Sequence, residues 1–328
     1  MDTNIVSRLT LTTVPSHLSS LEGAIWGQFV GDAAGLGTHW IYDLDDLAVQ
    51  FPSGIQGFET PRKGHYHEGK QAGDQTHYGD TALLLLESLA ACGDFRENDF
   101  GLRFEGYFNS PICKSYKDHA TRETLANLSS TPGNYQNGAN DDQMATITRL
   151  APVVIGYHQN PENDRLDAIR RLTRVTQNHA TAEACCLASA VLLQHLLNGT
   201  PFREAFETTR KSAEVSCDGS DYFEFAHMLR EMDVITATGR FGQSCPLPQS
   251  FPAALHAAWT HHDDFSSAIL NTLKAGGDNA GRAAMVGAWL GASLGMEGIP
   301  EEWLNRLTQR PRIEAAIKQW FEKLIEKA

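Results

Sequence analysis

Two segments, one near each end of the chain, carry a glycine at every fourth position. These two glycine ladders consist of Gly23, Gly27, Gly31 and Gly35, and then of Gly287, Gly291 and Gly295. Residues four apart lie on the same face of an α-helix, so each ladder predicts a helix with one face free of side chains. An interior glycine costs a helix roughly 1 kcal/mol relative to alanine. Close approach of another helix or of a ligand is expected to offset that cost.

Polar residues within and beside the ladders argue against membrane spans, since Gln28, Asp32 and Arg282 interrupt their apolar stretches. The formal net charge of -13 disfavours nucleic acid and anionic membranes as partners. The cysteines include no CxxC pair, and the first twenty residues lack the basic start and apolar centre of a signal peptide. We therefore expect a cytoplasmic protein that binds neither nucleic acid nor membrane.

Apolar residues recur at helical spacing along most of the chain, whereas alternating strand-like runs are scarce. The predicted helices cover 20–35, 80–92, 161–175, 180–198, 201–215, 221–237, 263–275, 279–296 and 311–327. The pattern predicts an all-α fold with a single domain over 19–328. A loosely ordered N-terminal tail is expected over 1–18.

Two long segments, 51–79 and 128–143, lack helical periodicity and are rich in His, Asp, Gly, Asn and Tyr. Loops of this length in a compact domain are usually functional or mobile. The first leads into a helix whose start is marked by Asp80 and Thr81, where backbone N–H groups favour anions. Taken alone, Asp80 is better explained as a simple N-cap, and Asp278 after its two glycines also has the ordinary pattern of an N-cap.

The second segment contains NGANDDQ, in which Asp141 and Asp142 stand among amides just before an apolar run. A solvated turn with a helix cap and a functional site are both consistent with this pattern. His65 and His67 form an HxH pair, which is weak evidence for a metal. The chain has no GxSxG nucleophile elbow, no GxxxxGK[ST] phosphate loop and no GxGxxG after a strand.

Three blocks in the expected order resemble motifs of the ADP-ribosylglycohydrolase family. They are GAIWGQFVGDAAG, then YGDTALLLLESLA, and then the stretch from FPAALHAAW through GGDNAGRAAMVGAWLGASLG to IPEEW. The resemblance covers about residues 20–307. It implies an all-α, orthogonally packed multi-helix domain whose site lies between helix ends.

The chain departs from the family at most of its metal-ligating acids. His39 stands where the family has a glutamate, and only Asp80 and Asp278 remain of the acids in the second and third motifs. Asn279 offers a carbonyl oxygen beside them. Magnesium prefers near-octahedral oxygen coordination that includes carboxylates, so these losses are expected to weaken at least one of the two metal sites.

The same departures resemble one branch of the family, which contains the J-type crystallins and selenoprotein J. The segment THWIYD (38–43), the YGD form of the second motif and the GGDN form of the third carry this likeness. The acids of ANDDQ are candidates for a replacement acid cluster in this branch.

The resemblance implies a glycoside hydrolase that cleaves an N- or O-glycosidic bond to an ADP-ribosyl or related ribosyl group, assisted by magnesium at an altered site. The substrate is a small molecule or a protein-linked conjugate. Asp80 and Asp278 are the expected metal or ribose ligands, and Asp141 or Asp142 is the expected general base. The remaining expected ligand-binding residues are His39, Trp40, Tyr42, Tyr78, Thr81, Gly277 and Asn279. The alternative is an inactive nucleotide-sugar-binding or structural protein that keeps the fold.

Overall fold

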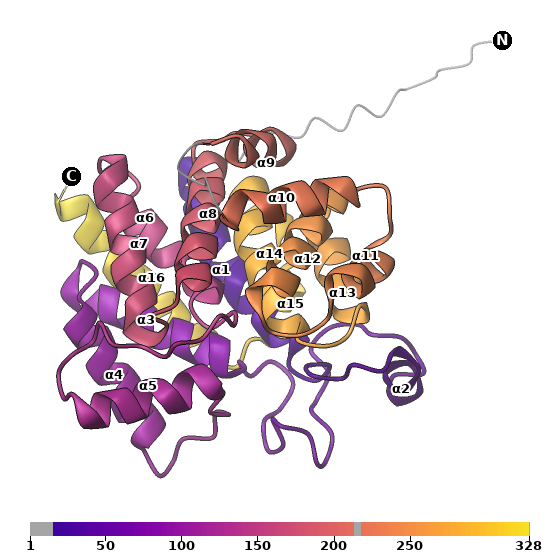
Figure 1. The fold of residues 1–328 in the computed structure, drawn as a ribbon, viewed down its shortest axis with the longest axis horizontal. Helices are drawn as coiled ribbons and strands as arrows, with labels where there is room; N and C mark the ends of the chain where they lie inside the picture. Colours follow the sequence, from indigo (N-terminus) through magenta and orange to yellow (C-terminus); the bar gives the residue numbers. More distant parts are fainter. Residues whose placement is uncertain (1–15, 213–217, 328) are drawn as a thin grey trace.

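Residues 16–212 and 218–327, which the computed structural model describes, form helices joined by loops (Figure 1). In chain order the helices are α1 (His17–Gly35), α2 (Leu44–Gln50), α3 (His77–Cys92), α4 (Glu97–Asn109), α5 (His119–Ser130), α6 (Ala151–Gly156), α7 (Glu162–Thr176), α8 (Ala180–Leu197), α9 (Phe202–Arg210), α10 (Asp218–Met228), α11 (Val234–Phe241), α12 (Leu247–Thr260), α13 (Phe265–Lys274), α14 (Asn279–Leu294), α15 (Glu301–Arg306) and α16 (Arg310–Lys327). Between these described residues β-pairing is limited to isolated bridges. The predicted all-α class is confirmed.

The two glycine ladders pack against each other, because α1 and α14 run antiparallel at very short separation. A Cβ atom added at Gly27 would lie 2.0 Å from the carbonyl oxygen of Gly287, and one added at Gly287 would lie 2.0 Å from that of Gly27. Gly23 and Gly291 are paired in the same way. The backbones therefore occupy the space that side chains would need, which is the close approach predicted from the sequence.

Several helix boundaries differ from the predicted ones. The predicted helix 221–237 is two helices, α10 and α11, and Asp233 caps the second by accepting a hydrogen bond from Thr236 N at 3.0 Å. The predicted boundary at residue 18 falls inside α1, while residues 1–15 of the expected tail lie outside the described residues. Helices α4 and α5 were not predicted. In α4 the buried face is formed by Phe100, Phe104 and Phe108, which are spaced four apart, so this helical signal was overlooked. Helix α5 has few apolar positions, and its stability comes from packing.

Helix α8 is long and apolar enough to cross a membrane by length and composition alone. However, 67% of its most apolar stretch is buried inside the protein. The central helix of a water-soluble core has the same properties. Its neighbours in the main core include Trp289 of α14 and residues of α1.

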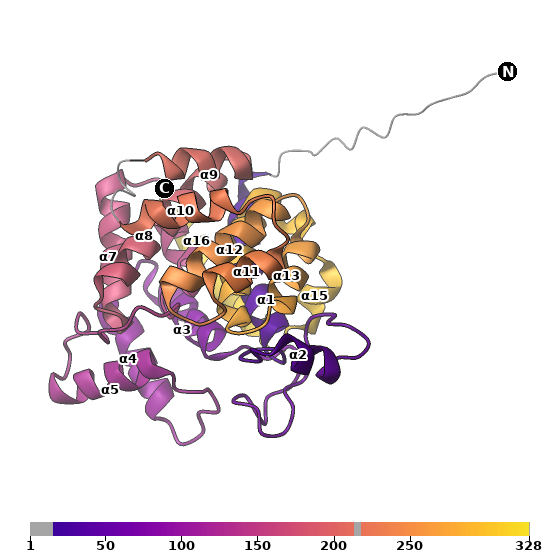
Figure 2. The same ribbon diagram turned by 45° about the vertical axis from the view of Figure 1, so that its right-hand side comes forward.

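The antiparallel pairing brings the C-terminal end of α1 to the N-terminal end of α14. The segment after α1 is tied there by an antiparallel bridge between Ile41 and Gly277. In both views α2, the long loops beside it, α4 and α5 lie along the lower edge of the molecule (Figures 1 and 2). Polar loops far apart in the sequence therefore meet at one end of the helical core.

Candidate functional site

The Asp278 carboxylate, just before α14, is fully buried and accepts three side-chain hydrogen bonds. His39 Nε2 donates to Oδ1 at 2.8 Å, and Trp40 Nε1 and Tyr78 Oη each donate to Oδ2 at 3.0 Å. The carboxylate makes no side-chain cap to α14. Burial alone would raise the pKa of Asp278, but His39 and Trp40 hold it below its ordinary value. The group is therefore an anion in a dry environment.

The backbone at Trp40 is held in a left-handed conformation, with φ of 60°, which is rare for a bulky residue. Its N–H donates to the Gly277 carbonyl at 2.8 Å, and Gly277 N–H donates to the Ile41 carbonyl at 2.7 Å. Such a conformation costs about 1–3 kcal/mol and persists where surrounding contacts enforce it. Here it directs the indole N–H onto Asp278.

Two histidines continue the network away from Asp278. His39 Nδ1 lies 2.8 Å from His67 Nε2. Since His39 Nε2–H faces the carboxylate, its Nδ1 is assigned as an acceptor, and His67 Nε2–H as the donor to it. His67 Nδ1 then carries no proton and is a hydrogen-bond acceptor. It is buried without a partner among the described residues. Burial lowers the pKa of His39, and burial with the adjacent His39 lowers that of His67 well below its ordinary value, so both rings are neutral at neutral pH.

Asp80 lies in a second polar cluster, in the first turn of α3. The helix begins at His77 and its N-cap is Thr76, so the interpretation of Asp80 as an N-cap was wrong. Lys70 Nζ lies 2.5 Å from Asp80 Oδ2, and the hydroxyls of Ser115 and Tyr107 donate to the same oxygen. A lysine from the preceding loop thus neutralises this acid.

Asp118 and Asp141 bring two further carboxylates to this end of the core. Asp118 caps α5 and lies 3.4 Å from His77 Nε2. Burial would raise the pKa of Asp118, but His77 and the hydrogen bond from Thr121 lower it to about 2. Asp141 Oδ2 accepts a hydrogen bond from His119 Nδ1 at 2.6 Å, and burial raises the pKa of this acid. Neighbouring carboxylates whose pKa values are shifted in opposite directions are typical of sites in which one group acts as an acid and another as a base.

The thiol of Cys245 lies close enough to several of these acids for their negative charges to change its pKa. Burial, then the charge of Asp278, and then those of Asp141 and Asp118 raise the pKa of Cys245 to about 12. A thiol with so high a pKa is protonated at neutral pH and is a poor nucleophile.

Aromatic rings cover the outer side of the network. Trp40 meets Tyr66 edge-on with ring centroids 5.0 Å apart, and meets Tyr116 in the same way at 4.9 Å. A cavity of about 300 Å³ opens beside them and is lined by Trp40, Ile41, Tyr42, Asp43, Asp46, Arg62, Gly64, His65 and Tyr66. Burial, followed by the charge of Asp278, raises the pKa of Tyr42 to about 12. The aromatic faces suit a flat ligand, whereas the Arg62 guanidinium is already paired with Asp46 at 3.4 Å and Asp43 adds a second carboxylate to the lining.

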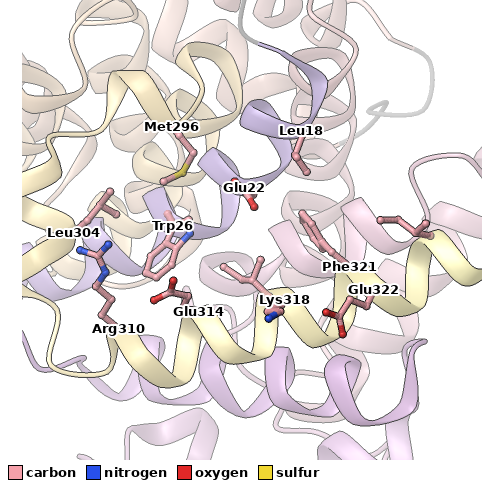
Figure 3. Close-up of a pocket in the computed structure, with 12 residues that line it drawn as sticks. Leu18, Glu22, Trp26, Met296, Leu304, Arg310, Glu314, Lys318, Phe321 and Glu322 are labelled. Carbon is pink, nitrogen blue, oxygen red and sulfur yellow. The ribbon is translucent and has the colours of Figure 1, made fainter.

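A separate cavity of about 480 Å³ lies between α1, α15 and α16 (Figure 3). Apolar side chains such as Trp26 and Phe321 form its floor, with Glu314 and Lys318 at its edge. No residue predicted for the site is among the described residues that line it. We do not take this cavity as the candidate functional site, because the buried ionisable groups described above lie at the other polar cluster and not in its lining.

Comparison with known proteins identifies the family. Residues 13–328 match the family model described as ADP-ribosylglycohydrolase. The chain belongs to the ADP-ribosylglycohydrolase family. It is similar to Crystallin J1A of Tripedalia cystophora, at 26% identity with 93% of this chain and 97% of the relative covered.

Two further ADP-ribosylglycohydrolase relatives support this assignment. The ADP-ribosyl-(dinitrogen reductase) glycohydrolase of Rhodospirillum rubrum is 24% identical, with 95% of this chain and 98% of the relative covered. A solved structure titled "ADP-ribosylglycohydrolase-related protein complex" superposes with a TM-score of 0.70 at 25% identity, covering 94% of this chain and 99% of that one. The predicted hydrolase class agrees with the family, and the predicted likeness to the J-type crystallins is confirmed.

The structure brings part of the predicted ADP-ribosylglycohydrolase site together. His39, Trp40, Tyr78 and Gly277 surround Asp278, whereas Asp80 is held in its own cluster. Thr81 Oγ1 donates to the His77 carbonyl at 2.7 Å. Asn279 Nδ2 donates to the Thr38 carbonyl at 3.2 Å, which leaves Asn279 Oδ1 buried without a partner among the described residues. Asp142 is half-buried, and its carbonyl accepts from Leu247 N at 2.8 Å.

Sequence reasoning missed several residues of the site. Lys70, Ser115, Tyr116, Asp118 and His119 all belong to it, and His67 was considered only as a weak metal ligand. The crowding of histidines around position 67 was the available signal. Nothing in the spacing of Lys70 or Ser115 points to Asp80.

The residues present do not fit the two-magnesium site that the resemblance implies. In the described ranges, no three His, Cys, Asp or Glu side chains are grouped so that they could hold a metal ion. Asp80 Oδ2 is engaged by an ammonium group, and both oxygens of Asp278 accept hydrogen bonds from protein donors. Both acids are therefore already engaged by protein donors, Asp80 by an ammonium group and Asp278 by neutral donors.

Proposed function

We propose that this protein is a glycoside hydrolase that cleaves an N- or O-glycosidic bond to an ADP-ribosyl or related ribosyl group. The observation that carries the proposal is the convergence of buried ionisable groups with displaced pKa values at one end of the core. Asp118, Asp141, Asp278, His39 and His67 are its main members. Such clusters are common at catalytic sites, because catalysis needs groups whose protonation differs from that in water.

Asp141 is the proposed general base. Burial raises its pKa, which makes it a stronger base than an exposed carboxylate, and the contact with His119 orients it. In the proposed reaction Asp141 takes a proton from water as that water attacks the anomeric carbon. The glycosidic bond breaks, and the leaving group departs with its electron pair and takes up a proton from solvent. His67 Nδ1 is too weak a base for this role, but it is a ready acceptor for a ligand hydroxyl.

Asp278 supplies the electrostatic part of the mechanism. Glycoside hydrolysis passes through a transition state with positive charge on the sugar ring. A buried carboxylate that stays ionised stabilises such a charge without having to reorganise. Trp40 and Tyr66 supply faces on which a flat base or sugar can stack.

Magnesium assistance, which the resemblance implies, is not a step of this mechanism, because the acids at its expected positions are engaged by protein donors. The proposed substrate is a small molecule or a protein carrying the ribosyl group. A cytoplasmic setting is also part of the proposal.

The proposal is tested by hydrolysis of a panel of ADP-ribosyl and ribosyl conjugates, with and without magnesium. Asp141→Asn is expected to lower kcat about 100-fold or more, as loss of a general base typically does. Asp142→Asn is the matched control and is expected to keep near wild-type turnover. Equal activity of the wild type and Asp141→Asn would refute the assignment of the base.

A second candidate is a ligand-binding or structural protein without hydrolytic activity. It is favoured by the contacts of Asp80 with Lys70 and of Asp278 with His39, because acids engaged in this way are not available to bind metal ions. Calorimetric binding of ADP-ribose with no turnover of any conjugate would decide for this candidate.

A further inference from the structure

We infer that the ammonium group of Lys70 is a built-in cation, which occupies an oxygen-lined site at Asp80 and excludes divalent metal ions from it. The inference goes beyond hydrolysis, because it holds whether or not the protein is catalytically active. The Lys70 side chain is 8% exposed and that of Asp80 is 14% exposed. Charged groups so far removed from water need partners, and the arrangement around Lys70 shows what those partners are.

Three oxygen atoms surround Lys70 Nζ. They are Asp80 Oδ2 at 2.5 Å, the Gln75 carbonyl oxygen at 2.6 Å and Ser115 Oγ at 3.4 Å. An ammonium group has three N–H donors, so these acceptors match its full capacity. A carboxylate, a backbone carbonyl and a hydroxyl are also the hard oxygen donors that magnesium and calcium select.

Hydroxyl donors complete the shell around the Asp80 carboxylate. Ser115 Oγ donates to Oδ2, and Tyr107 Oη donates to the same atom at 3.2 Å. Burial, followed by the charge of Asp80, raises the pKa of Tyr107, so this phenol stays protonated and remains a donor. The Oδ2 atom therefore has its negative charge met by one cation and two hydroxyls.

A divalent ion bound to this oxygen would share it with the Lys70 ammonium. Two cations on one carboxylate oxygen repel strongly in a site that is mostly shielded from water. Metal binding would require Lys70 to leave its buried position and to give up its contact with the Gln75 carbonyl. The lysine thus acts as the barrier to metal binding, while the oxygen donors remain suited to a cation.

The Asp278 carboxylate has no cationic side chain among its hydrogen-bond donors in the described residues. Its donors are the neutral His39 ring, the Trp40 indole and the Tyr78 hydroxyl. The buried Arg282 guanidinium donates instead to the carbonyls of Gln243 and Gly276. Replacement of a metal by a lysine is therefore specific to Asp80.

The experiment is a titration of the full-length chain with Mn²⁺, in which free Mn²⁺ is followed by electron paramagnetic resonance. Wild type is expected to bind no Mn²⁺ that depends on Asp80. Lys70→Met removes Nζ and its charge and leaves an apolar side chain that ends at the Cε position, and it is expected to bind one Mn²⁺ at least about tenfold more tightly than wild type. Lys70→Arg, the matched control, keeps the charge and should exclude Mn²⁺. The double variant Lys70→Met/Asp80→Asn should lose the site.

Two results would overturn the inference. One is an Mn²⁺ site in the wild type that Asp80→Asn abolishes. The other is a folded Lys70→Met variant, verified by circular dichroism, that binds Mn²⁺ no better than wild type. If Lys70→Met does not fold, Lys70→Ala, verified in the same way, takes its place in the titration, and the same two results would overturn the inference. Since no activity is measured, failure here is distinguishable from failure of the proposed hydrolase function.

Discussion

Gly27→Ala at the contact between α1 and α14 is expected to destabilise the protein by about 2 kcal/mol. The added Cβ would lie 2.0 Å from the Gly287 carbonyl oxygen, whereas an ordinary contact begins at 3.4 Å. The two helices would have to separate locally by about 1.4 Å. The obstacle is the backbone of another helix, which cannot rotate aside as a side chain can.

The magnitude follows from two opposing effects. Overpacking a tight core typically costs about 1–3 kcal/mol, and a backbone obstacle places this site at the upper end of that range. Replacing an interior helical glycine by alanine returns about 1 kcal/mol through helix propensity. The difference between these effects is the expected net loss.

Gly106→Ala in α4 is the matched control, because a Cβ at this position meets no atom within 4 Å. It should gain up to about 1 kcal/mol in the free energy of unfolding. Urea denaturation followed by far-ultraviolet circular dichroism measures both variants. The gap between them should be about 3 kcal/mol, and equal stability of Gly27→Ala and Gly106→Ala would refute the reasoning.

Two further predictions concern buried titratable groups. Burial raises the pKa of Asp32 from 3.8 to about 6, so folding takes up a proton between these values. The contribution of Asp32 to the free energy of unfolding is therefore largest below about pH 4. About 3 kcal/mol of this contribution is lost as pH rises through about 6. Asp32→Asn should remove this slope from urea denaturation curves measured across the range, and an unchanged slope would contradict it. The Cys245 thiol, whose pKa is about 12, should react with iodoacetamide at pH 8 at least about 100-fold more slowly than an ordinary thiol. Asp278→Asn should speed that reaction, as followed by mass spectrometry; a fast wild-type reaction would show that the thiol is not held protonated.

Asp32 also shows where local reasoning stopped. In the sequence it served only as an argument against a membrane span, but its carboxylate accepts hydrogen bonds from the N–H of Thr76, at 2.7 Å, and from the Thr76 hydroxyl. It therefore positions the N-cap of α3, 44 residues away. The break between α10 and α11 was missed for the opposite reason, since apolar spacing continues across it although Asp233 is a readable cap.

The sequence by itself determined the all-α class and predicted a close approach of a helix or a ligand at each glycine ladder, and the family resemblance named Asp278, His39, Trp40 and Tyr78 as expected site residues. These properties rest on helical periodicity and on short motifs, which are local. Only the tertiary structure decided that Lys70 neutralises Asp80 and that His67 extends the network from Asp278. Those contacts depend on how long loops fold over the helix ends, and loop geometry is set by burial and hydrogen bonding between distant segments. The glycine ladders bring the two helix ends together, and the loops decide which charges meet there.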